Sequence, residues 1–162
     1  MPTEISGSTG VDKIQSDAIE TGDLPTGSVL QVVQGTSTTS TSTSSTSYVD
    51  SGLSATITPS STSSKILISA TFSFDTNTNG EQPYLAFYRG TDNLNGAANA
   101  NAWGTLYSAT RVIAQISGVQ LNSPSSTSAL TYSVKFKSAA GGAIEFTTQG
   151  TVSYITLMEI AG

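Results

Sequence analysis

The stretch KILISATFSFD, from Lys65 to Asp75, alternates apolar side chains with small polar ones. Its apolar residues, from Ile66 to Phe74, would share one face of an extended strand, while Ser, Thr and Asp residues share the other. A period of two indicates a half-buried β-strand, because successive side chains point to opposite faces of a sheet. Residues Leu130–Lys137 repeat the pattern, with Leu, Tyr, Val and Phe opposing Thr, Ser and Lys. The chain is therefore expected to form sheets that present surfaces.

Further stretches of this kind lie on both sides, separated by Gly, Pro, Asn and Ser residues. We expect strands at Val29–Val33, Ser47–Asp50, Ala55–Thr58, Tyr84–Arg89, Arg111–Leu121, Ala129–Lys137, Ile144–Thr148 and Val152–Ile160. Short strands between such turns are typical of β-sandwiches and jelly rolls. The sequence predicts an all-β protein: an antiparallel β-sandwich of jelly-roll type over residues 27–162, after an N-terminal extended arm of residues 1–26. The predicted core comprises Ile68, Phe72, Phe74, Phe87, Ile116, Tyr132, Val134, Phe136, Phe146, Ile155 and Leu157.

An unbroken run of Ser and Thr extends from Thr36 to Ser47. Such composition is typical of disordered segments, whereas Thr by itself favours strands. We expect this run to form a long surface loop or an edge ribbon.

The first 26 positions are polar and acidic, with a few scattered apolar side chains. A flexible tail and a docking arm, partly helical between Gly10 and Gly22, are both compatible with this composition. The apolar side chains favour the docking arm, because a pure linker has no need of them. The residues expected to make the attachment are Ile5, Val11, Ile14 and Ile19.

The composition excludes several classes of function. The chain has 162 residues, no His, no Cys and a net charge of −5, so a disulfide framework and the ordinary zinc, haem and iron–sulfur sites are excluded. Its six Lys and Arg residues are too few to neutralise a series of phosphates. The start lacks the features of a signal peptide, and no apolar run is long enough to cross a bilayer. We expect a protein made in a cytoplasm, without cofactor, metal, nucleic-acid partner or membrane insertion.

Catalysis has few candidate groups in this sequence. A Ser nucleophile needs a base, and Lys135 and Lys137, two of the four Lys residues, fall on the polar face of a strand, where we expect them to be solvated. Asp75 and Glu81 are interpreted as solvated loop acids rather than as a glycosidase pair. The segment between them resembles a calcium loop, but it lacks the Glu spacing of that motif, so we interpret it as a turn. The sequence predicts that the chain is not an enzyme.

The loop from Gly90 to Ala109 is the best candidate for recognition. It contains the only Trp of the chain together with Tyr, Asn and small residues, and Arg side chains flank it. Aromatic side chains beside Asn, Asp and Arg are common in sugar sites and protein contacts. The candidate receptor-binding residues are Arg89, Asp92, Trp103 and Tyr107. The alternative is that the Trp closes the end of the sandwich.

The last expected strand is apolar on both faces. Ile155 and Leu157 would point one way, and Val152, Tyr154, Met158 and Ile160 the other. A strand of this kind must be covered on both sides. The core covers one side, and either a neighbouring copy or the chain's own loops cover the other. We expect a subunit contact near Val152, Tyr154 and Met158.

Several segments together resemble a family of virion surface proteins of tailed bacteriophages, notably those of marine bacteria and cyanobacteria. The segments are Val11–Gln15, Leu24–Gln34, Tyr48–Leu53, Ala55–Pro59 and Tyr154–Ile160. The resemblance implies tail-fibre tips or capsid fibres and decoration proteins, in which a trimer of β-sandwiches follows an N-terminal attachment arm. It implies no catalytic residues.

The expected function is a non-enzymatic structural protein of a phage virion, assembled in the host cytoplasm. It would be a homotrimeric short fibre or capsid decoration protein, joined to a capsid or tail protein by its arm and contacting a glycan or protein of the host surface. The alternative is a secreted carbohydrate-binding module or adhesin.

Overall fold

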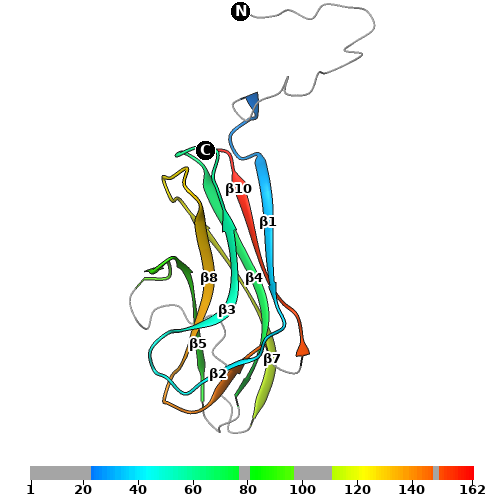
Figure 1. Cartoon of the computed structure of the whole chain (residues 1–162), viewed down its shortest axis with the longest axis vertical. Helices are drawn as coiled ribbons and strands as arrows, with labels where there is room; N and C mark the ends of the chain where they lie inside the picture. Colours follow the sequence, from blue (N-terminus) through cyan, green and yellow to red (C-terminus); the bar gives the residue numbers. More distant parts are fainter. Residues whose placement is uncertain (1–22, 77–80, 97–110, 148–149) are drawn as a thin grey trace, which may run out of the picture.

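Two antiparallel sheets, one of six strands and one of four, pack as a sandwich in the computed structural model (Figure 1). The structure describes residues 23–76, 81–96, 111–147 and 150–162. Its strands are β1 (Val29–Ser37), β2 (Thr41–Thr43), β3 (Val49–Ile57), β4 (Lys65–Thr76), β5 (Pro83–Arg89), β6 (Asp92–Asn93), β7 (Val112–Asn122), β8 (Leu130–Ser138), β9 (Ile144–Phe146) and β10 (Ser153–Ile160). The prediction of an all-β sandwich of antiparallel strands is confirmed. In the described ranges, no helix has the length and apolar character needed to cross a membrane.

Strand β4 is the longest strand and holds the six-stranded sheet together. Along one edge it pairs with β7, from Ile66 opposite Asn122 to Thr76 opposite Val112. Along its other edge it pairs first with β10 and then with β9. The sheet continues from β10 to β1 and from β9 to β2. Neighbours on both edges satisfy the backbone of β4, and its apolar face is free to cover the core.

The four-stranded sheet has the order β3-β8-β5-β6. The sequence predicted two strands on either side of a Ser51-Gly52 turn, and this prediction is wrong, because both belong to β3. The pairing of β3 with β8 shifts register between Asp50 and Ser54. Gly52 has a φ of 78°, and its N–H donates to the Asp50 carboxylate at 2.9 Å. The two residues therefore form a bulge within one strand.

The core lies between the inner faces of the two sheets. Phe146 contacts the rings of Phe72 and Phe136, with centroids 4.8 and 5.5 Å apart. Every predicted core residue is buried except Ile116, which packs against the core and is partly buried. The prediction missed other fully buried positions, among them Leu53, Ile57, Ile66, Ala70, Leu85, Ala86 and Ile144.

The Ser/Thr run forms an edge ribbon, which is one of the two structures predicted for it; the other was a long surface loop. It continues β1 as far as Ser37 and then forms β2, which ends one side of the six-stranded sheet. Hydroxyl groups hold the ribbon to its surroundings: Ser40 donates to the Glu145 carboxylate, and Thr41 donates to the carbonyl of Ser51 at 3.3 Å.

The region after Gly90 contains a strand where the sequence predicted only loop. Gly90 adopts a φ of 57°, which a glycine reaches without steric cost. The chain turns back there, so that Asp92 and Asn93 pair with Arg89 and Tyr88. Strand β6 is therefore the second arm of a short hairpin.

Candidate functional site

The two outer faces of the sandwich are the candidate functional surfaces. Among the described residues no three His, Cys, Asp or Glu side chains are grouped as a metal site would require. The two outer faces differ strongly in chemistry: the six-stranded sheet exposes apolar side chains, and the four-stranded sheet carries tyrosine and lysine side chains.

Four apolar side chains form a row across the outer face of the six-stranded sheet. Met158 of β10 pairs in register with Val32 of β1 on one side and with Leu67 of β4 on the other. Leu67 in turn lies opposite Leu121 of β7. Val32 and Leu121 are 56% and 52% exposed, and Leu67 and Met158 are half-buried. We call these four residues the apolar row.

The apolar row belongs to a larger concentration of exposed apolar side chains. Of the eight exposed large apolar side chains among the described residues, all but Leu24 lie in the six-stranded sheet or directly beside β10. They are Val29, Val32, Ile113, Val119, Leu121, Val152 and Tyr154. Single exposed apolar residues are normal on a protein surface, whereas a contiguous group marks an interaction site.

Strand β10 has the two faces that the sequence predicted. Ile155 and Leu157 are buried in the core, whereas Tyr154 is 41% exposed and Met158 is half-buried. Val152, also 37% exposed, precedes the strand. The described loops leave Tyr154 uncovered, so the outer side of β10 remains available to a partner.

The outer face becomes polar towards β9. The hydroxyls of Thr71 and Ser117 bond at 2.8 Å, and Asp75 forms an ion pair with Arg111. The prediction that Asp75 is a solvated loop acid is wrong, because its carboxylate is fully buried and accepts from Nε of Arg111 at 3.0 Å. Hydrogen bonding and the charge of Asp75 raise the pKa of Arg111.

Tyrosine and lysine side chains interleave on the outer face of the four-stranded sheet. The Lys135 ammonium lies 4.6 Å from the centroid of the Tyr88 ring. The Lys137 ammonium lies 5.0 Å from the Tyr48 ring and 5.4 Å from the Tyr84 ring. Tyr48 and Tyr88 contact each other edge to face, at 5.8 Å. We call these five residues the tyrosine–lysine face.

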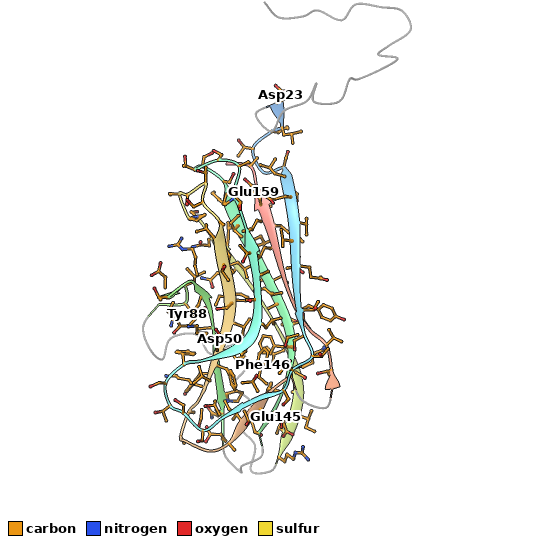
Figure 2. The ribbon with its side chains drawn as sticks, in the orientation of Figure 1. Asp23, Asp50, Tyr88, Glu145, Phe146 and Glu159 are labelled. Atoms are coloured by element: carbon orange, nitrogen blue, oxygen red, sulfur yellow. The ribbon has the colours of Figure 1, made fainter. Side chains whose placement is uncertain are left out.

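The prediction that the two lysines are solvated is wrong for Lys137, whereas Lys135 is only partly shielded from solvent. Lys137 is only 7% exposed and Lys135 is half-buried, and the ammonium group of each lies over neighbouring tyrosine rings. An ammonium group over an aromatic ring is attracted by the negative face of the ring, more strongly where water is partly excluded. Figure 2 labels Tyr88 and Asp50 near each other on the side of the sandwich away from β1.

The described members of the predicted receptor site, Arg89 and Asp92, contact each other beside the last residue of β7. Arg89 pairs with Asp92 at 3.1 Å and donates to Asn122 at 3.2 Å. Tyr132 donates its hydroxyl to the same Asn122 oxygen at 2.9 Å, and burial raises its pKa to about 12. Trp103 and Tyr107 lie outside the described residues, as do the predicted attachment residues. Those are Ile5, Val11, Ile14 and Ile19.

Glu81 is a structural carboxylate, and its interpretation as a solvated acid is wrong. It is 3% exposed and accepts backbone N–H groups of Ala139, Ala140 and Gly142 at 2.8, 3.1 and 2.6 Å. Burial alone would raise its pKa, but the backbone amides and the Ser138 hydroxyl outweigh burial, so the pKa is lowered. Glu81 thereby ties the start of β5 to the loop between β8 and β9.

Glu159 has the same role at the other end of the sandwich (Figure 2). It is fully buried and accepts from the Gln31 side chain at 2.5 Å and from both the N–H and the hydroxyl of Ser60 at 2.7 Å. Burial raises its pKa, and these hydrogen bonds lower it by more, so the net shift is downward.

Acid should destabilise the folded chain through Glu81 and Glu159. Both pKa values lie below the usual 4.5, so the unfolded chain takes up protons at a higher pH than the folded chain does. The two carboxylates contribute fully to stability above pH 4.5, the usual pKa of the unfolded chain, and this contribution is lost as the pH falls through the lower pKa values of the folded chain. Urea denaturation in steps from neutral pH to about pH 3 measures this loss. Glu81→Gln should weaken the pH dependence, and an unchanged midpoint at acid pH would contradict the assignment.

Sequence reasoning found only parts of the two surfaces, Met158 of the apolar row and the shared face of Lys135 and Lys137, because it did not fix the pairing of strands. Tyr84 and Tyr88 are four positions apart in one strand, and Lys135 and Lys137 are two apart in another, so the residues of each pair point to the same side of their strand. Only the pairing of β5 with β8 brings the two pairs together. The apolar row likewise requires the registers of four strands.

Comparison of the sequence with protein-family models and with curated proteins finds no match.

Proposed function

We propose that the chain is a non-enzymatic structural protein on the surface of a tailed phage. It is a homotrimeric short fibre or capsid decoration protein, held to the particle by its N-terminal arm. The resemblance described above supports the phage assignment. The main support for association of copies into a trimer is the exposed apolar row on the outer face of the six-stranded sheet.

A second copy of the chain is the occupant that best fits the apolar row. The row contains no charged residue, and with a net charge of −5 copies of this chain would repel one another across most other surfaces. Tyr154 and Met158, from the predicted contact, lie on the same side of β10 as the row. Three copies that each bury this face close into a ring and leave no open interface.

The strand order supports the finer assignment of a jelly roll. A jelly roll consists of two sheets joined by Greek-key connections, so that strands from the two ends of the chain become neighbours. Here β1 pairs with β10, and the sheets have the orders β1-β10-β4 with β7 on the far side of β4, and β3-β8-β5-β6. This fold is frequent in viral capsid proteins.

The place where the chain passes from the arm into the sandwich supports attachment by the arm. Asp23 lies at the same end of the molecule as Glu159 in Figure 2, and the Glu145 end is opposite. Val32, Met158, Leu67 and Leu121 all lie toward the Glu159 end of their strands. Trimer formation would therefore gather three arms at one end, and the other end would point away from the particle.

Removal of Met1–Leu24 should separate assembly from attachment. The truncated chain keeps the complete apolar row, so it should remain trimeric by light scattering. It should be missing from purified virions by mass spectrometry, whereas the full chain should be found there and be labelled by immunogold. Normal incorporation of the truncated chain would place the anchor elsewhere, and absence of the full chain from virions would reject the proposed function.

A further inference from the structure

The tyrosine–lysine face has the chemistry of a binding surface and remains accessible in the proposed assembly. It belongs to the four-stranded sheet, on the opposite side of the sandwich from the apolar row. If the six-stranded sheet faces the neighbouring copies, the four-stranded sheet faces outward. This inference rests on the proposed function for that orientation, but the chemistry of the face does not depend on it.

Positive charge is scarce in this chain, and two Lys residues lie close together on this face. Of the five described Lys and Arg residues, Lys135 and Lys137 occupy alternate positions of β8 and point to the same side. Lys135 makes no ion pair with a carboxylate of the described ranges. Asp50 lies opposite Lys135 in the register, and its carboxylate accepts the N–H of Gly52 and forms no ion pair with Lys135, although its charge stays nearby. The Lys135 charge is therefore available to an anion.

The tyrosines add hydrogen-bonding groups and flat apolar area. Burial raises the pKa of Tyr48 and of Tyr88, so both phenols remain uncharged at neutral pH, and a phenol hydroxyl can both donate and accept. Tyrosine suits surfaces that are apolar on one side and wet on the other. A ligand with hydroxyl groups as well as anionic groups would use both kinds of side chain.

We propose that the tyrosine–lysine face binds an acidic polysaccharide, a polymer of sugars that carry carboxylates. Lys135 pairs with a sugar carboxylate, and the phenols of Tyr84 and Tyr88 bond the sugar hydroxyls. A single partly exposed ion pair contributes little, so a small acidic sugar would bind weakly. A polymer reaches the same face on all three copies at once, and such multivalency strengthens binding without new contacts.

The test is binding of the purified full chain to immobilised polygalacturonate, with dextran as the uncharged control. We expect binding to polygalacturonate, weaker binding as salt is added, and none to dextran. Lys135→Met should weaken binding at least tenfold, and Tyr88→Phe should weaken it less, because it removes only the hydroxyl. Lys65→Met, on the six-stranded sheet, is the matched control and should bind as the unchanged chain does. Light scattering and thermal unfolding verify that each variant is folded and trimeric.

Several outcomes would overturn the proposal. These are equal binding to dextran, full affinity in Lys135→Met, and equally tight binding of polyglutamate, which would indicate recognition of acidic chains in general. A chain that binds polygalacturonate but is absent from virions would reject the proposed function and leave the binding site standing. The monomeric Leu121→Asp variant should keep the site and lose the gain from multivalency.

Discussion

Leu121→Asp should convert the proposed trimer into monomers. Leu121 is 52% exposed on β7 at one end of the apolar row, so an aspartate is tolerated in the free chain. In the trimer the carboxylate would be buried against apolar side chains without a partner, which costs several kcal/mol. Light scattering at micromolar concentration should give three times the 16.6 kDa of one chain before the change and a single chain afterwards.

A matched change on the other sheet tests whether loss of the trimer is specific to the apolar row. Thr131 is exposed on the four-stranded sheet, and Thr131→Asp introduces the same charge without affecting the apolar row, so it should stay trimeric. Met158→Asp, at the centre of the row, should also give monomers. An unchanged chain that is monomeric, or a Leu121→Asp variant that remains trimeric, would refute this interface.

Gly35→Ala should destabilise the fold severely. A Cβ atom at Gly35 would lie 2.0 Å from the carbonyl oxygen of Ser54 and 3.1 Å from Cγ2 of Ile155. Ser54 belongs to β3 of the opposite sheet, so β1 and β3 approach each other backbone to backbone at this point. Because neither backbone can move without disturbing its own sheet, we expect a loss of roughly 3 kcal/mol or more in the free energy of unfolding. Urea denaturation measures it.

Gly52→Ala is the control for this change, because there alanine meets an unfavourable backbone conformation but no steric clash. Nothing lies within 4 Å of a Cβ atom at Gly52, but its φ is 78°, so alanine there meets only conformational strain of about 1–2 kcal/mol. Gly35→Ala should cost clearly more. If the two variants unfold at the same urea concentration, the close approach of β1 and β3 is wrong.

The alternating pattern predicted β4 and β8 well because each of these strands has one face on the core. Ile66, Ile68, Ala70 and Phe72 are all fully buried or nearly so, as a period of two requires. The pattern failed at Ser51-Gly52, where residues typical of turns form a bulge, and at Asp92–Asn93, where a hairpin depends on one glycine conformation. Turn-forming residues report a change of chain direction or a local irregularity, and the sequence alone does not distinguish the two.

The candidate surfaces were less predictable than the core. Burial of a side chain follows from its own strand, whereas a surface group depends on which strands become neighbours. Asp75, Glu81 and Lys137 were expected to be solvated, and each is buried by a partner distant in sequence: Arg111, the loop after β8, and the tyrosine rings. Trp103 and Tyr107 remain predictions, since they lie outside the described residues.

The position of β10 between β1 and β4 has a consequence for the order of folding. β1 acquires its one neighbour in the described sheet, and the first half of β4 its second, only after Ser153–Ile160 has been synthesised. Until then both strands carry rows of unpaired N–H and C=O groups, and pairing of segments so distant in sequence is slow. A nascent chain is thus exposed to wrong strand pairing until synthesis of β10 is complete, and the six-stranded sheet can close only after that point.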